Sequence, residues 1–94
     1  MRVRWLRRAL ENLGEEAAYI ARDDPHTAAR IVERIATSVE RLATHPASGR
    51  PGRVPGTREL VISGTPYIVP YRVHGEAVEI LRVFHAARKW PERF

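Results

Sequence analysis

The sequence predicts an α+β protein in which a helical hairpin packs on a small antiparallel sheet, in the order β-α-α-β-β-β. Two stretches with helical spacing of apolar residues occupy the first half of the chain, and three β-rich stretches divided by turn residues occupy the second. The 94 residues suffice for a single domain, 1–94, with one core. One face of a small sheet can be buried against two helices, which leads to this architecture.

The first helix is predicted from apolar residues that recur in alternating steps of four and three. These residues are Leu6, Leu10, Leu13, Ala17 and Ile20. The short apolar start from Val3 to Leu6 is typical of an edge strand. Asp24 is a good N-cap and Pro25 suits a first helical position, so a second helix is expected to begin there.

The second helix is expected to run from about Pro25 to Ala43. Its apolar stripe consists of Ala28, Ile31, Val32, Ile35, Val39 and Leu42. Pro46 disfavours helix at His45, so the helix should end before that pair. Two amphipathic helices joined by a few residues predict an antiparallel hairpin.

The remainder of the chain has a loop and strand character. Ala47 to Gly56 shows no periodicity and forms a loop long enough to suspect function. The predicted strands are Leu60 to Ile62, Tyr67 to Val73 and Val78 to Phe84, with turn residues between them. Pro70 cannot donate a ladder hydrogen bond, which predicts a bulge or an exposed edge.

The last predicted strand and the tail each indicate a contact. Val78 to Phe84 is apolar on both faces apart from Glu79 and Arg82, and such surplus apolar surface suggests a covering partner. In the basic tail from Ala86 to Phe94, Trp90 is expected to anchor the segment to the body of the protein.

Composition excludes several classes of site. The chain has no cysteine, and its four histidines lack metal-ligand spacing, so neither a metal nor a cofactor is expected. No run of about 20 apolar residues is present, and the basic start is not followed by the apolar core of a signal peptide. A cytoplasmic location without membrane contact is therefore expected.

The charge predicts an anionic partner. The net charge is +5 and the sequence pI is about 10.7, which favours a nucleic acid or an acidic protein over solubility alone. Arg50, Arg53 and Arg58 lie where the Gly/Pro-rich loop leads into the sheet, and we favour anion contact over a solvated loop. The candidate target-binding residues are Arg50, Arg53, Arg58, Arg72, Arg88 and Lys89.

Several motifs in a fixed order carry a family resemblance. They are L-A-x-H-P at 42–46, G-R-P-G-R-V-P-G-T-R-E-L-V at 49–61, Y-R-V at 71–73 and I-L-R-V-F-H-A-A-R at 80–88. Together they resemble the RelE/ParE superfamily over nearly the whole chain. The resemblance implies the toxin of a type II toxin–antitoxin system, which arrests bacterial growth and is neutralised by a cognate antitoxin. We expect that antitoxin to be acidic and partly disordered and to form a hetero-oligomer with the toxin.

The resemblance leaves two targets open. RelE-like members cut mRNA on the ribosome, and ParE-like members inhibit DNA gyrase by binding. A metal-independent ribonuclease would use Arg58, Arg82 and His85, because arginines stabilise the phosphorane and a histidine can act as acid or base. Arg58 and His85 match site positions of ribonuclease members.

The sequence departs from the ribonuclease pattern at two places. Ile68 rather than arginine follows Tyr67, and Ala86 rather than tyrosine follows His85. The sequence therefore favours ParE-like inhibition of gyrase, with the ribosome-dependent mRNA endonuclease as the alternative. Structural roles stay open as well: His85 could be hydrogen-bonded at the strand end, and Arg82 could pair with a carboxylate such as Glu59 or Glu79. A DNA-binding module with a recognition helix is disfavoured, because both apolar stripes are needed for the core.

Overall fold

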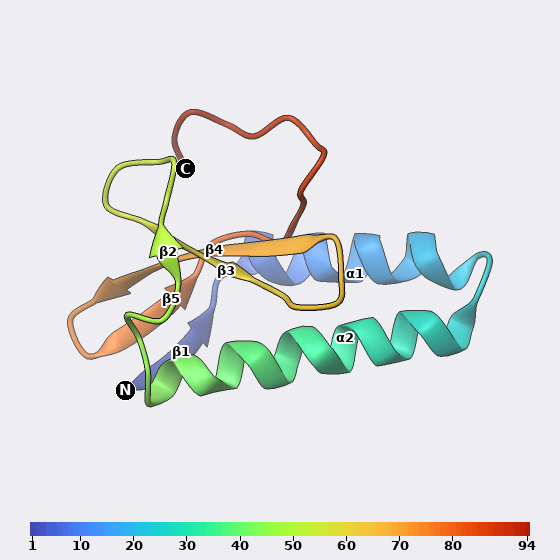
Figure 1. The fold of residues 1–94 in the computed structure, drawn as a ribbon, viewed down its shortest axis with the longest axis horizontal. Coiled ribbons are helices and arrows are strands. Elements are labelled where there is room, and N and C mark those ends of the chain that lie inside the picture. The colour runs from blue at the N-terminus through green and yellow to red at the C-terminus, as the bar shows by residue number, and fades with distance from the viewer.

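Two antiparallel helices lie side by side against one face of a mixed sheet in the computed structural model, which describes residues 1–94 (Figure 1). The predicted α+β class and the helical hairpin are confirmed. The elements are β1 (Arg2–Trp5), α1 (Arg7–Ala21), α2 (Pro25–Glu40), the 3-10 turn η1 (Arg41–Ala43), β2 (Arg50–Pro51), β3 (Arg58–Val61), β4 (Tyr67–His74), β5 (Ala77–Ile80) and β6 (Phe84–His85).

The second helix begins at the predicted cap. The Asp24 carboxylate accepts hydrogen bonds from Thr27 N at 3.1 Å and from Thr27 Oγ1 at 2.6 Å, and Pro25 takes the first helical position. The hydrogen bonds from Thr27 hold the pKa of Asp24 below its ordinary value. α2 passes directly into η1, so the helical segment ends at Ala43, as the sequence predicts.

The sheet differs from the expected all-antiparallel arrangement in one pairing. The strand order is β1-β5-β4-β3-β2, with β6 beside β4. β2, β3, β4 and β5 pair antiparallel with their neighbours, but β1 pairs parallel with β5. A short strand shows the same apolar alternation in either direction, so the sequence pattern predicts the strand but not its polarity.

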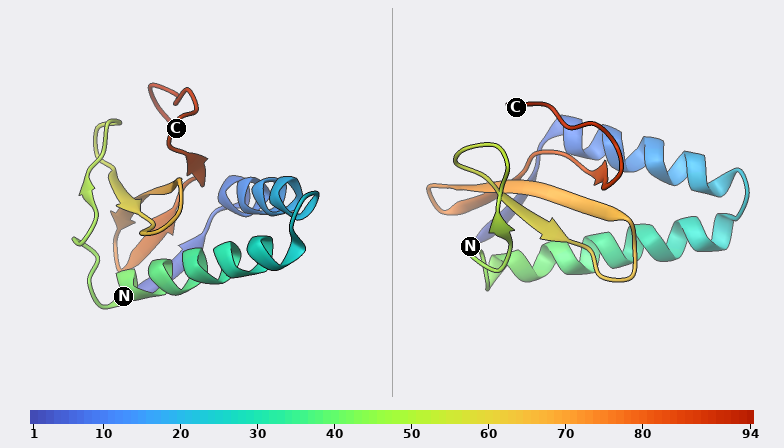
Figure 2. Two further views of the ribbon diagram at one scale, coloured as in Figure 1. Left: turned by 45° about the vertical axis from the view of Figure 1, so that its right-hand side comes forward. Right: turned by 45° about the horizontal axis from the view of Figure 1, so that its top comes forward.

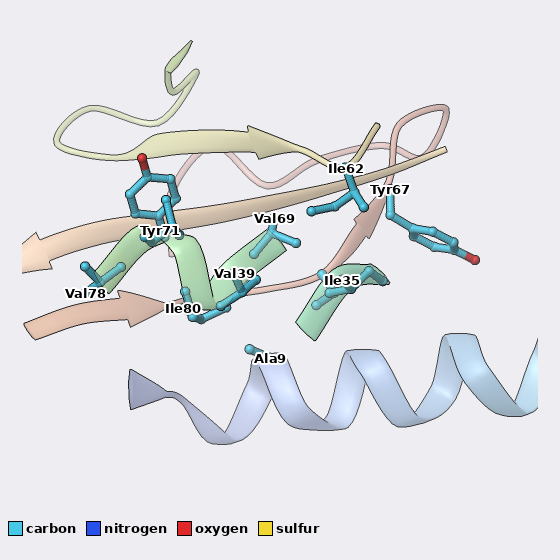
Figure 3. Packing of buried hydrophobic residues seen from close by; sticks show 11 residues of the cluster. Ala9, Ile35, Val39, Ile62, Tyr67, Val69, Tyr71, Val78 and Ile80 are labelled. Atoms are coloured by element: carbon cyan, nitrogen blue, oxygen red, sulfur yellow. The ribbon is translucent and has the colours of Figure 1, made fainter. Parts of the chain in front are cut away.

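The core fills the space between the helices and the inner face of the sheet (Figure 3). Tyr71 and Ile80 lie opposite each other on β4 and β5, and both belong to the buried cluster. The buried cluster comprises Ala9, Ile35, Val39, Leu42, Ile62, Tyr67, Val69, Tyr71, Val78, Ile80 and Val83. The predicted apolar stripe of α2 therefore supplies three members of the core.

The predicted strand Val78 to Phe84 is divided by a bulge beside Pro70. Ile80 pairs with Tyr71 and Phe84 pairs with Ile68, so three residues lie opposite two. Leu81 N donates to Pro70 O at 3.0 Å, and Pro70 has no N–H to return the bond. The Leu81 carbonyl instead accepts a hydrogen bond from Arg82 Nη1 at 2.6 Å. The bulge predicted from Pro70 is thus present in the neighbouring strand.

The turn that joins α1 and α2 projects beyond the sheet, as two views show (Figures 1 and 2). The C-terminal segment leaves β6 and runs back over the other side of the sheet towards β2. None of the helices combines the length and the apolar character that a membrane span requires.

Candidate functional site

The face of the sheet that points away from the helices carries Glu59 on β3, beside the edge strand β2. Glu59 lies opposite Arg50 on β2 and Pro70 on β4, and only 3% of its surface is exposed. Its carboxylate accepts hydrogen bonds from Arg50 Nε at 3.1 Å and Nη2 at 3.0 Å. It also accepts from Arg53 N at 2.9 Å, Nε at 3.0 Å and Nη2 at 3.3 Å. One buried carboxylate therefore holds two loop arginines.

Two opposing effects act on the Glu59 carboxyl. Burial raises its pKa, but hydrogen bonds from the side chain and backbone of Arg53 and from the side chain of Arg50 outweigh that effect and leave the pKa below its ordinary value. The carboxylate thus stays ionised at neutral pH. The loop predicted to be functional is rigid for this reason, and it presents Arg50 and Arg53 in a fixed geometry.

Gly49 and Tyr71 hold the other end of the loop. The Tyr71 hydroxyl donates to Pro46 O at 2.7 Å and accepts from Gly49 N at 2.8 Å. A Cβ atom at Gly49 would lie 2.6 Å from the Tyr71 ring and 2.9 Å from Glu59 O. Only glycine therefore allows the loop to approach this closely.

Arg58 belongs to the opposite, helix-facing side of the sheet. It lies opposite Tyr71, and directly opposed residues share a face. Arg58 Nη1 donates to Gly49 O at 2.8 Å and to Ala47 O at 3.3 Å. The guanidinium forms no ion pair, so its present role is to bind the carbonyl groups of the loop.

A second carboxylate on the outer face is shared between two strands. Glu79 accepts from Arg72 Nε at 2.8 Å, and Arg4 Nη1 lies 3.6 Å from its other oxygen. The hydrogen bond from Arg72 outweighs burial and lowers the pKa of Glu79. Arg72, predicted to bind a target, is therefore engaged within the sheet.

The C-terminal tail covers the apolar end of the outer face, as the expected anchor at Trp90 implies. The Arg53 guanidinium lies 3.7 Å from the centre of the Trp90 ring. The Phe84 ring lies 4.8 Å from that of Trp90 and 6.3 Å from that of Phe94. Part of the surplus apolar surface for which the sequence suggests a covering partner is thus covered by the chain itself.

Arg82 occupies the bulge and pairs with neither Glu59 nor Glu79. Besides its bond to the Leu81 carbonyl, its guanidinium lies 5.2 Å from the centre of the Phe94 ring. Burial and, secondarily, the charge of Arg8 lower the pKa of Arg82. The interpretation of Arg82 as the partner of a sheet carboxylate is therefore wrong.

His85 lies beside Tyr67 on the helix-facing side. The two rings meet edge to face with centres 5.7 Å apart, and His85 Nδ1 accepts from Ala87 N at 3.2 Å. Burial and the neighbouring Glu16 carboxylate raise the pKa of Tyr67 to about 12. Arg88 Nη1 lies 3.2 Å from Glu16 Oε2, whereas Lys89 is exposed and has no ionic partner. Arg88 thus ties the start of the tail to α1.

The three candidate ribonuclease residues occupy separate backbone positions of the sheet. Arg58 lies opposite Tyr71 and His85 lies opposite Tyr67, so their positions are four residue steps apart on β4, about 13 Å along the strand. Arg82 lies in the bulge between these positions. Sequence reasoning overlooked Glu59 as the residue that organises the loop arginines. No group of three or more potential metal ligands is present.

A family profile described as "ParE toxin of type II toxin-antitoxin system, parDE" matches residues 3–90. The chain belongs to this family of toxins. It is 57% identical over 91 residues to "Putative toxin Y4kP" of Sinorhizobium fredii, covering 97% of this chain and 94% of that protein. It is 38% identical over 84 residues to "Toxin RelE2" of Caulobacter vibrioides, covering 89% and 93% of the two chains.

A solved structure extends the similarity of the toxin to three dimensions. A chain of the "Chromosomal ParDE TA system from P. aeruginosa" matches with a TM-score of 0.80 and 32% identity, covering 90% of this chain and 95% of that one. The protein is thus a type II toxin of the RelE/ParE superfamily, as the sequence motifs predict. Membership implies a cognate antitoxin.

The toxin also exposes an apolar surface at the projecting end of its helical hairpin. A hollow of about 490 Å³ there is lined by Ala17, Ala18, Ala21, Ala28, Ala29, Val32 and Glu33. Small side chains on both helices produce this hollow. It lies on the helical layer, whereas Glu59 and its arginines lie on the outer face of the sheet.

Proposed function

We propose that the toxin arrests growth by binding DNA gyrase and inhibiting it, rather than by catalysis of its own. The observation that carries this proposal is the dispersal of Arg58, Arg82 and His85 over separate positions of the sheet. The departures at Ile68 and Ala86 from the ribonuclease pattern support it. Gyrase is a cytoplasmic enzyme, so we infer that the toxin acts in the cytoplasm.

RNA cleavage requires its catalytic groups to lie close together, so the separate positions of Arg58, Arg82 and His85 bear on whether the toxin is a ribonuclease. A general acid or base must reach the proton it transfers at about 3 Å, and donors for the phosphorane must lie at a similar distance. His85 uses Nδ1 for Ala87 N, and Arg58 is bound to loop carbonyls. Groups held in this way by the fold stabilise structure, and their separation disfavours a shared reacting phosphate.

The exposed loop arginines form a binding surface, which fits inhibition by binding better than a ribonuclease active site does. Arg50 and Arg53 are fixed by Glu59 yet keep 51% and 44% of their side-chain surface exposed. Such pre-organised groups lose little conformational entropy on binding a partner. We assign them, with Lys89 and the exposed part of Arg88, to target contact.

The experiment is a supercoiling assay with purified gyrase and relaxed plasmid. The toxin should inhibit supercoiling, and the His85→Ala variant should inhibit it to the same extent. A Lys89→Glu variant should weaken inhibition, with Arg22→Glu as a control on the exposed end of α1. Unchanged supercoiling at a large excess of folded toxin would refute the proposal.

The second candidate is a ribosome-dependent mRNA endonuclease, which the 38% identity to "Toxin RelE2" favours. It would require Arg58, Arg82 and His85 to be brought together on the ribosome. It predicts that His85→Ala abolishes toxicity while antitoxin binding is preserved. Translation reactions with purified ribosomes and a defined mRNA would reveal codon-boundary cleavage if this candidate is correct.

We infer that the cognate antitoxin is acidic and partly disordered. A toxin of net charge +5 would attract such a chain. Burial of apolar antitoxin side chains in the exposed hollow of the hairpin would stabilise the antitoxin as it folds on contact. Association rates should then fall steeply with salt. A salt-independent association rate would contradict this charge complementarity.

A further inference from the structure

α2 presents a second side that is neither core nor apolar hollow. Arg30 and Arg34 are exposed there, and Arg41, the first residue of η1, continues the row. Their spacing places them on one face with Thr37 and Ser38. Together with the β3–β4 turn they line a hollow of about 520 Å³. Its lining residues are Arg30, Glu33, Arg34, Thr37, Ser38, Arg41 and Ser63, none of them hydrophobic. We call this set the α2 basic stripe.

The α2 basic stripe follows a helix, and the β3–β4 turn is held against it. Eleven residues separate Arg30 from Arg41, which is about 16 Å along a helix. Arg34 Nη1 donates to Ser63 O at 2.9 Å. A Cβ atom on Gly64, whose φ is 78°, would lie 2.5 Å from that same Nη1 atom. The turn is therefore seated directly on Arg34, and the hollow is pre-formed.

The α2 basic stripe carries an excess of positive charge. It carries three arginines against Glu33 alone, and none of the three arginines forms an ion pair. By contrast, Arg50, Arg53, Arg72 and Arg88 are all paired with carboxylates. Guanidinium and hydroxyl donors in a row are the groups that contact the phosphates of nucleic acids.

We propose that the α2 basic stripe binds the sugar–phosphate backbone of duplex DNA, without reading its sequence. Single-stranded nucleic acids are usually held by aromatic side chains that stack on unpaired bases. No aromatic residue lines this hollow, and its donors suit the regular phosphates of a duplex. The lining of the α2 basic stripe is polar throughout, so it offers hydrogen bonds and ion pairs to phosphates.

This binding would place the toxin on the DNA that gyrase holds. That role rests on the function proposed above, whereas the DNA contact itself does not require gyrase. The proposed DNA contact and the proposed action on gyrase can therefore be refuted separately.

The test is fluorescence anisotropy of a labelled 20-base-pair duplex titrated with the purified full chain. The Arg30→Gln/Arg41→Gln variant keeps helix propensity and leaves Arg34 on the β3–β4 turn. We expect its affinity to fall roughly tenfold or more in 0.1 M salt, and its salt slope to decrease by about 2. The matched control, Arg7→Gln/Arg22→Gln, removes the same charge from exposed positions at the start and the C-cap of α1 and should bind within about twofold of the parent.

Any one of four results would overturn the proposal. The parent chain fails to bind the duplex at low salt, or the α1 control loses as much affinity as the α2 variant. Alternatively, single-stranded RNA of equal length binds the parent as tightly as the duplex and is equally sensitive to the α2 change. Loss of affinity for the antitoxin with unchanged DNA binding would likewise assign the α2 basic stripe to the antitoxin. A gyrase assay run in parallel reports on the proposed target alone.

Discussion

The Glu59 carboxylate accepts hydrogen bonds from both the backbone and the side chain of Arg53. Arg53 N lies 2.9 Å and Arg53 Nε 3.0 Å from the same carboxylate oxygen. The Arg53 guanidinium also lies over the Trp90 ring, 3.7 Å from the ring centre. One arginine therefore joins the sheet, the loop and the C-terminal tail. This contact makes the surface proposed for target binding a single rigid unit.

The Glu59→Gln variant should be less stable at neutral pH by about 1–3 kcal/mol, because it removes the charge that holds Arg50 and Arg53. The folded state lowers the pKa of Glu59, so its stabilisation is present above the ordinary pKa of a glutamate. It is lost as the pH falls through the lowered value. Denaturant unfolding of both proteins should therefore show a stability gap at pH 7 that narrows as the pH falls below the ordinary pKa of a glutamate and closes below the lowered value.

The exposed Glu33 has no ionic partner, so Glu33→Gln is the control for that titration and should leave the unfolding curve within about 0.5 kcal/mol of the parent. A stability gap for Glu59→Gln that persists undiminished in acid would show that the loss does not arise from the carboxylate charge.

Two glycine-to-alanine substitutions should change the stability of the protein in opposite directions. Gly49→Ala would place a Cβ atom against Tyr71 and the Glu59 carbonyl, and overpacking of this kind costs about 1–3 kcal/mol. Gly14 lies within α1 with nothing near its missing Cβ, so Gly14→Ala should stabilise by roughly 0.5–1 kcal/mol. Thermal unfolding of both variants measures the difference, and a Gly49→Ala protein as stable as the parent would contradict the close approach of the loop.

Removal of one hydroxyl should loosen the loop without disturbing the core. Tyr71→Phe leaves Pro46 O and Gly49 N without their buried partner, which costs about 1–3 kcal/mol. Tyr19 is 66% exposed, so Tyr19→Phe should be nearly neutral. Denaturant unfolding compares the pair; equal stabilities would mean that the hydroxyl of Tyr71 does not hold the loop.

The tail should detach when its aromatic anchor is removed. Trp90→Ala loses the contacts with Arg53 and Phe84, and amide hydrogen exchange at residues 86–94 should accelerate while exchange in β4 stays slow. Lys89→Ala, at an exposed neighbour without a partner, serves as the control. Unchanged protection of the tail in Trp90→Ala would locate the anchor elsewhere.

Much of the fold could be predicted because its signals are local. Asp24 and Pro25 define the start of α2, and the apolar stripe of α2 identifies its buried face. On α1 the predicted stripe is wrong at Leu10, which is 53% exposed, because the helix turns Ala9 into the core instead. Pro70 predicts a bulge because the missing N–H has a direct consequence for the ladder. The parallel pairing of β1 with β5 could not be predicted, since strand polarity depends on how the helical hairpin returns the chain.

The site was less predictable because its contacts join distant segments. Glu59 is one acid among eleven in the sequence, and only the register that sets it opposite Arg50 reveals its role. The division of the last strand at Arg82 likewise depends on the opposing Pro70. Arg30, Arg34 and Arg41 look like an ordinary solvated helix face until the β3–β4 turn is placed against them.

The most direct test of a toxin that acts by binding gyrase is to induce it in cells without its antitoxin and to follow DNA, RNA and protein synthesis by pulse labelling. We predict that DNA synthesis fails first, with filamentation and an SOS response, while translation continues, and that His85→Ala behaves in the same way. An immediate stop in translation with mRNA cut at codon boundaries, abolished by His85→Ala, would contradict the account and identify a ribosome-dependent nuclease.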